Sequence, residues 1–221
     1  MINWAIKNEV QKFLNNIENK KILDFGCGDS RYKELIDNSN NYIGIDVIDS
    51  GHPDYNKKHD LIWDKKKLPF EDNFFDLILM TEVLEHVDNV ETTLKELHRV
   101  LNINGSMLIT VPFLWKEHEK PYDFQRYTSF GLKNLFIKNG FEIISQRKLV
   151  EKKMAILELI NSEFNAIKVS DLKRNKYFFF TKFYYFFLKN FFKLIFKFFI
   201  SKSNFKDYYI GNSIIVKKVP I

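Results

Sequence analysis

Two glycines and an acidic residue stand at the ends of two short apolar runs. Gly26 and Gly28 follow the run Lys21–Phe25, and Asp46 closes the run Tyr42–Ile45. Glycines at a strand-to-helix turn let a ligand approach the backbone, because no side chain blocks it. An acid about twenty residues later can bind both hydroxyls of an adenosine ribose. The spacing therefore predicts a site for an adenosine-containing cofactor.

Arg31 distinguishes this turn from the dinucleotide fingerprint Gly-x-Gly-x-x-Gly, because it occupies the third glycine position. Its large side chain would prevent the close helix–strand contact which that glycine provides. The pattern therefore disfavours a pyrophosphate ligand.

Five motifs in order resemble those of class I S-adenosylmethionine-dependent methyltransferases, especially the type 11 group. Asp24-Phe-Gly-Cys-Gly28 resembles motif I, and the resemblance extends over roughly Lys20–Glu142. The other motifs are Asp64 with Leu68-Pro-Phe70, Phe74–His86, Leu97–Leu101 and Asn104–Ile109. Ser30 departs from the pattern, since the family commonly has a third glycine there. The resemblance implies an enzyme that transfers a methyl group from S-adenosylmethionine.

The resemblance also implies which residues surround the cofactor. Asp24, Gly26 and Gly28 would line its methionine moiety, and Thr81 and Glu82 would border that moiety and the acceptor's entrance. The others are Asp46 at the ribose, Val47 at the adenine, and Trp63 and Asp64 flanking the adenine, with the Asp64 carboxylate on its amino group.

A hydroxyl acceptor must lose its proton, so methyl transfer to it calls for a base, whereas an amine can attack once it is neutral. The candidate catalytic bases are His86, His118 and Asp123. The alternative for His86 is a structural histidine that caps the turn before Asp88.

The segment Pro112–Tyr127 is expected to bind the acceptor, because long structured loops in compact domains are usually functional. Trp115 and Tyr122 can stack on a flat or sugar-like group, and Arg126 can bind an anionic group. Alternatively, Asp123 and Arg126 pair only to hold the loop. The pattern of His, Pro, Asp, Arg, Tyr and Thr here resembles methyltransferases of bacterial surface-glycan pathways.

Apolar runs alternate with amphipathic segments along the chain, which predicts an α/β fold with a parallel sheet covered on both faces. The resemblance implies a Rossmann-like, doubly wound sheet of seven strands, mostly parallel, with the last strand antiparallel. The predicted strands are Lys21–Phe25, Tyr42–Ile45, Asp60–Trp63, Phe75–Met80, Met107–Val111, Phe141–Leu149 and Asn212–Val219. Helices are expected over Trp4–Ile17, Tyr32–Ile36, Val90–Leu101 and from Thr128 or Ser129 to Gly140.

The expected organisation is a cofactor-binding core over residues 1–149, a helical insertion over 150–211 and a final core strand over 212–221. Within the insertion, Tyr177–Ile200 is rich in Phe, Tyr and Lys. Its lysines disfavour a transmembrane span and favour an amphipathic helix lying on an anionic membrane. The alternatives are packing on the core or a homodimer interface, while nucleic-acid binding is weaker because Arg is nearly absent.

Cys27 is the single cysteine and the five histidines are scattered, so the sequence predicts neither an intramolecular disulfide nor a metal site. The N-terminus lacks the pattern of a signal peptide. The expected location is cytoplasmic, on the inner face of a membrane where the insertion binds it.

The expected reaction is methylation of a hydroxyl on a glycan or lipid-linked glycan in cell-surface biosynthesis. Two alternatives remain. One is a methyltransferase that acts on a quinone, a lipid or another small molecule. The other is a non-catalytic membrane adaptor that retains the fold.

Overall fold

The computed structural model describes residues 1–47, 59–166, 186–187, 190–191 and 206–219. Within them, one sheet of seven strands has the order β3-β2-β1-β4-β5-β7-β6. The strands are β1 (Lys21–Phe25), β2 (Asn41–Asp46), β3 (Leu61–Ile62), β4 (Phe75–Thr81), β5 (Leu101–Pro112), β6 (Phe141–Glu151) and β7 (Tyr209–Lys218).

The first five strands are parallel to one another, and β7 pairs antiparallel with both β5 and β6. This confirms the predicted α/β fold with a mostly parallel sheet. The strand order reverses at β1, which has β2 on one side and β4 on the other. Ligands of open α/β sheets bind beyond the carboxyl ends of the strands at such a point.

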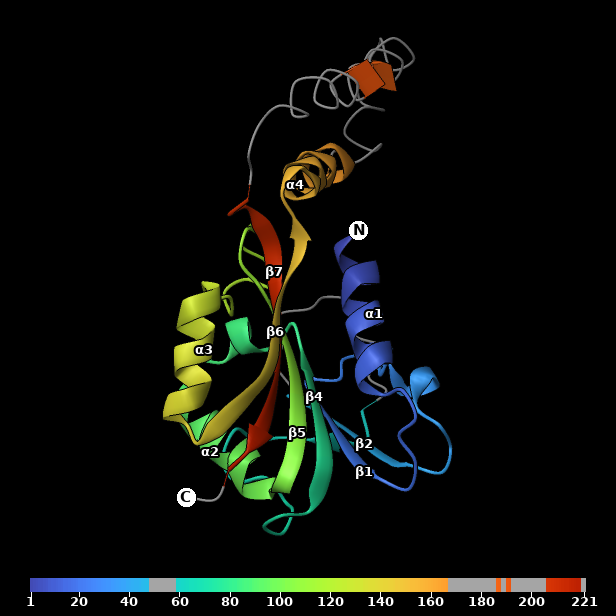
Figure 1. Cartoon of the computed structure of the whole chain (residues 1–221), viewed down its shortest axis with the longest axis vertical. Helices are drawn as coiled ribbons and strands as arrows, with labels where there is room; N and C mark the ends of the chain where they lie inside the picture. The colour runs from blue at the N-terminus through green and yellow to red at the C-terminus, as the bar shows by residue number, and fades with distance from the viewer. Residues whose placement is uncertain (48–58, 167–185, 188–189, 192–205, 220–221) are drawn as a thin grey trace.

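Helices cover both faces of the sheet (Figure 1). On one face, α1 (Ile2–Phe13) buries Ile6 and Val10 against residues such as Ile22 and Leu79. The opposite face packs against α2 (Val90–Val100) and α3 (Ser129–Lys138). The central strands are therefore apolar on both faces, as parallel strands buried between two layers require.

Some elements differ from their expected bounds. The helix expected over Tyr32–Ile36 is a single 3-10 turn, η1 (Lys33–Leu35). The Asp37 side chain accepts the Ser39 backbone N–H, and such local bonds compete with helix formation. Strand β5 begins early, because Leu101 already pairs with Phe75 before the register shifts.

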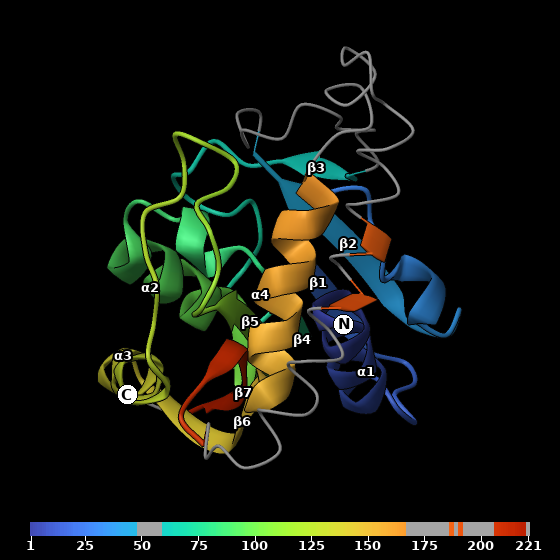
Figure 2. The same cartoon turned by 90° about the horizontal axis from the view of Figure 1, so that it is seen from above.

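Of the segment between β6 and β7, the structure describes one long helix, α4 (Lys153–Ala166), which lies beyond the carboxyl ends of the central strands (Figures 1 and 2). Apart from four residues, the predicted amphipathic segment Tyr177–Ile200 lies outside the described residues. None of the described helices has both the length and the apolar character that a membrane crossing requires.

Candidate active site

The turn after β1 is held in a conformation that only glycine adopts readily. Gly26 and Gly28 have φ angles of 74° and 59°. A Cβ atom on Gly26 would lie 2.4 Å from Cγ2 of Val83, so a larger residue would clash as well as strain the backbone. The backbone N–H groups of Gly26 and Cys27 both donate to the Ile45 carbonyl, at 2.8 and 3.1 Å. These bonds fix the turn against the end of β2.

Asp46 links the two strand ends through its carboxylate. Its Oδ2 accepts the Gly28 N–H at 2.7 Å, and its Oδ1 accepts the Val47 N–H at the same distance. A carboxylate has about four acceptor positions, so these two bonds are compatible with further bonds from ribose hydroxyls.

A cavity of about 500 Å³ lies beside this turn, at the carboxyl ends of β1, β2, β4 and β5. This volume falls in the range of small-molecule sites. Eleven of the residues predicted from the sequence line it: Gly26, Gly28, Asp46, Val47, Trp63, Thr81, Glu82, His86, Trp115, His118 and Tyr122. Residues predicted to bind the cofactor and residues predicted to act on the acceptor thus line the same cavity.

Trp63 adds a polar group to the cavity wall. Its ring packs edge-on against Phe25, with 5.1 Å between ring centroids. Its buried Nε1–H has no hydrogen-bond partner among the described residues. Because a buried donor without a partner is costly, this N–H favours a bound polar ligand.

Four predicted residues are not among those that line the cavity: Asp24, Asp64, Asp123 and Arg126. Asp24 is buried in β1, where its carboxyl accepts a hydrogen bond of 2.8 Å from Tyr42. Burial raises the pKa of Asp24 to about 7. The Asp64 side chain is 64% exposed, and its Oδ1 accepts the Lys66 N–H. Adenine recognition by Asp64 stays a prediction.

The sequence reasoning missed several cavity residues. Ile2, Asn3 and Ile6 of α1 line the cavity, although the sequence predicted for this region only an amphipathic helix over Trp4–Ile17. Arg31 and Tyr32 also line it. In the sequence, Arg31 indicated only that a dinucleotide is disfavoured, although its place after the glycine turn is a signal for cofactor contact.

The segment Pro112–Tyr127, which the sequence predicted to bind the acceptor and which is called the acceptor loop below, is hydrogen-bonded along the turn η2 (Leu84–His86). The Phe124 N–H donates to the Glu85 carbonyl at 2.9 Å. Nδ1 of His86 lies 2.8 Å from the Tyr122 carbonyl, and Gln125 Nε2 donates to the Val87 carbonyl. These bonds place His118 next to η2, although the two segments are distant in sequence.

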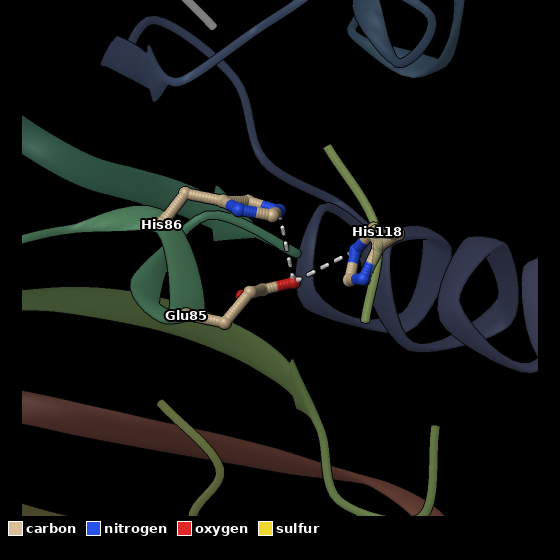
Figure 3. A group of neighbouring side chains, drawn as sticks. All are labelled: Glu85, His86 and His118. Carbon is tan, nitrogen blue, oxygen red and sulfur yellow. Dashed lines mark ion pairs between the residues drawn. The ribbon is translucent and has the colours of Figure 1, made fainter. Parts of the chain in front are cut away.

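Glu85 lies between the two histidines (Figure 3). Its Oε1 is 3.7 Å from Nε2 of His86 and 3.8 Å from Nε2 of His118. The Glu85 side chain is fully buried, and burial raises its pKa well above the usual value, as does the nearby charge of Glu82. The sequence predicted no metal site, but the fold brings these three groups within 4.8 Å of one another.

Asp123 lies beside Nδ1 of His118, on the opposite side of the imidazole ring from Glu85. Its Oδ2 lies 3.2 Å from Nδ1 of His118 and accepts the His118 backbone N–H at 2.9 Å. Arg126 donates to both carboxylate oxygens, so it holds the loop as the alternative interpretation expected. Burial alone would raise the pKa of Asp123, but the bonds from Arg126 and His118 outweigh it and lower the pKa to about 2.

Burial lowers the pKa of His118, and the neighbouring His86 lowers it further. His118 is therefore neutral at pH 7. Burial also raises the pKa of Glu82 to about 7, against the opposing effects of Thr110 and Arg126. The cavity wall thus carries a neutral imidazole, His118, and a carboxyl group with a raised pKa, Glu82.

A methyltransferase domain model matches residues 4–146, which is more than half of the chain. The chain belongs to the methyltransferase domain family. This confirms the class I S-adenosylmethionine-dependent methyltransferase predicted from the motifs, and with it the enzyme class and the cofactor.

The chain is also similar in sequence to individual curated proteins. The chain is 34% identical over 118 residues to the uncharacterized protein MJ0638 of Methanocaldococcus jannaschii, a match that covers 50% of this chain and 52% of that protein. It is 38% identical over 61 residues to the ubiquinone/menaquinone biosynthesis C-methyltransferase UbiE of Cupriavidus taiwanensis, covering 27% and 25%. The chain thus spans about half or less of these curated relatives.

The fold matches that of an S-adenosylmethionine-dependent methyltransferase from Mesorhizobium loti, with a TM-score of 0.57 and 12% identity. That match covers 97% of this chain and 98% of the other, so the likeness extends over nearly the whole of both chains. At this identity it is evidence about the fold alone.

Proposed function

We propose that this methyltransferase transfers the methyl group of S-adenosylmethionine to a hydroxyl oxygen of its acceptor, with His118 as the base. The observation that carries the proposal is the contact of His118 with Asp123 at the wall of the cavity, with 3.2 Å between Nδ1 and Oδ2. We further propose that the acceptor is a glycan or a lipid-linked glycan.

The glycine turn and Asp46 suit the adenosine and methionine parts of the cofactor. Gly26 and Gly28 leave their backbone open to a ligand, and Asp46 lies at the cavity wall at the end of β2. S-adenosylmethionine supplies an electrophilic methyl group on a sulfonium. Thr81 and Glu82, at the end of β4, would border that methyl group and the acceptor's entrance.

His118 suits the role of a base for three reasons. Its side chain is 28% exposed, so an acceptor can reach it. Its pKa is lowered, so the neutral form that can take a proton predominates at pH 7. Asp123 stays ionised and orients the ring, because hydrogen bonds from Arg126 hold its pKa at about 2. A base in this position typically contributes about 10²–10⁴-fold to the rate.

Trp115 and Tyr122 favour a sugar-like acceptor, since both line the cavity from the acceptor loop. Aromatic faces pack well against flat apolar surfaces while their edges remain polar. UbiE, which carries the name of a quinone-biosynthesis C-methyltransferase, supports the second candidate, a quinone carbon as acceptor.

Mass spectrometry of glycans and lipids tests the proposal in a strain that lacks the gene. We expect one glycan class to lose about 14 daltons, with fragment ions that place the missing methyl group on oxygen. The wild-type gene and the control Glu117→Gln should restore the methyl group, because the Glu117 side chain is 73% exposed.

His118→Gln and Asp46→Ala should fail to restore it while the proteins remain folded. A methyl group missing from a quinone carbon would replace the glycan proposal with the second candidate. Full restoration by His118→Gln would refute the role of His118 as base.

A further inference from the structure

We propose that Glu85, His86 and His118 form a binding site for a divalent transition-metal ion of the zinc class. The inference deepens the proposed function, because the site opens onto the cavity that would hold the acceptor. It rests on the positions of three lone-pair donors that face one another (Figure 3).

His86 presents a lone pair to the site. Its Nδ1 lies 2.8 Å from the Tyr122 carbonyl, which can only accept a hydrogen bond. Nδ1 of His86 must therefore carry the proton, which leaves Nε2 as the unprotonated atom of the neutral ring. This Nε2 is buried and has no hydrogen-bond partner among the described residues.

His118 is arranged differently, because its buried Nδ1 has no hydrogen-bond partner among the described residues. Asp123 Oδ2 lies 3.2 Å from Nδ1 of His118, so its carboxylate favours the tautomer with the proton on Nδ1. Nε2 of His118 then carries the lone pair and points toward Glu85. Histidines that bind metals commonly have a carbonyl or a carboxylate beside the second ring nitrogen, and both rings have one here.

Glu85 is the third proposed ligand. Its side chain is fully buried, and neither carboxylate oxygen has a hydrogen-bond partner in the described part of the chain. A protonated Glu85 could donate to a histidine, but 3.7 and 3.8 Å are too long for a hydrogen bond. Two imidazoles and a buried carboxyl group thus meet without a hydrogen bond between them, an arrangement that a cation would stabilise.

The spacing suits a small ion. Zinc binds histidine nitrogen and carboxylate oxygen at about 2.0–2.2 Å, so neighbouring ligand atoms of a tetrahedral site lie about 3.4 Å apart. The observed separations from Glu85 Oε1 exceed this by a few tenths of an ångström. The three ligand atoms lie within 4.8 Å of one another, so the two imidazoles and Glu85 must move closer together around an ion. Glu119, with Oε2 3.7 Å from Nε2 of His86, is placed to be a fourth ligand.

The ligand types select the ion. Two imidazoles and one carboxylate suit Zn²⁺, Co²⁺, Ni²⁺ or Fe²⁺, whereas Mg²⁺ and Ca²⁺ prefer oxygen ligands. A cation here would use the Nε2 lone pair that His118 needs as a base. In the loaded state, the cation itself would acidify a hydroxyl coordinated from the cavity.

Cobalt titration of the full-length protein, stripped of metal by a chelator, tests the site. We expect a visible absorption band of tetrahedral Co²⁺ that saturates at about one ion per chain and disappears on addition of Zn²⁺. Glu85→Gln and His118→Asn should weaken Co²⁺ binding at least about 10-fold. Glu117→Gln, in the same loop but exposed, should bind Co²⁺ like the wild type.

A wild-type protein that gives no such band overturns the proposal, and so do Glu85→Gln and His118→Asn proteins that bind Co²⁺ as tightly as Glu117→Gln. Thermal unfolding of each metal-free variant shows whether lost binding reflects lost folding.

Calorimetry with S-adenosylhomocysteine, the product that S-adenosylmethionine leaves after methyl transfer, separates the metal-site proposal from the proposed function. A protein that binds this nucleoside but no Co²⁺ refutes the metal site alone, whereas a protein that binds Co²⁺ but transfers no methyl group, with or without the metal, refutes the proposed function alone.

Discussion

At the scale of single residues, Asp24 lies in β1 with 1% of its surface exposed and accepts a hydrogen bond from Tyr42. Burial disfavours the charged form, so the pKa of its carboxyl rises from 3.8 to about 7. In the unfolded chain the same carboxyl is ionised above about pH 4. Folding therefore carries a cost that is absent below pH 4, grows between pH 4 and 7, and is constant above pH 7.

Asp24→Asn should remove this cost while keeping an acceptor for Tyr42. We expect the variant to exceed the wild type in free energy of unfolding by a margin that grows from pH 4 to pH 8. The growth should be on the order of 2–4 kcal/mol, since each pKa unit corresponds to about 1.4 kcal/mol. Urea denaturation at several pH values measures it, with Asp29→Asn as an exposed control. A margin that does not change with pH would contradict the prediction.

At the scale of elements, the turn between β1 and η1 depends on one close approach. Gly26 has φ 74°, and the side chain of Val83 fills the space that a Cβ atom would need. The chain can therefore pass from β1 to the cofactor cavity only with glycine at this position. The sequence showed the glycine, but the contact that requires it comes from the segment after β4.

Gly26→Ala should lower the free energy of unfolding by about 1–3 kcal/mol and weaken binding of S-adenosylmethionine. Adding Val83→Ala should restore part of the stability, because it removes the clash but leaves the strained φ. Gly131→Ala is the matched control: Gly131 lies in α3 without a positive φ, and its added Cβ would lie 3.2 Å from Oγ1 of Thr128, so its loss should be smaller than that of Gly26→Ala. Denaturant unfolding and calorimetry measure both effects. Equal losses for Gly26→Ala and Gly131→Ala would contradict the argument.

At the scale of the whole molecule, the sequence between β6 and β7 includes a basic, aromatic segment, Tyr177–Ile200. The chain has a net charge of +6, and no Asp or Glu stands between Asp171 and Asp207. We propose that Tyr177–Ile200 attaches the enzyme to an anionic membrane, where a lipid-linked acceptor would lie. Aromatic rings suit the membrane interface and lysines suit its headgroups.

Replacing Tyr177–Ile200 by a short polar linker should abolish flotation with liposomes that contain anionic lipid. Binding of S-adenosylmethionine should remain within about 3-fold of the wild type, since the cavity residues lie outside the segment. Changing the lysines Lys182, Lys189, Lys193 and Lys197 to glutamine should reduce flotation on anionic but not on neutral liposomes. Equal flotation of the linker variant and the full chain would refute membrane attachment.

The sequence by itself determined the fold class and the cofactor turn. Strand and helix patterns are local, and Gly26, Gly28 and Asp46 follow apolar runs that any parallel sheet would bring to one edge. The cap at Thr128, which accepts the Gly131 N–H, was predicted for the same reason. Such features need only neighbouring residues, so they can be read without the fold.

Only the tertiary structure decided how the acceptor side is built. Glu85 gave no signal in the sequence, because its burial depends on a loop that returns from beyond β5 and bonds to η2. That loop also brings His118 to His86, and α1 supplies a cavity wall. Contacts between distant segments depend on how the whole chain packs, so residue types alone could nominate His86 and His118 but could not place them together.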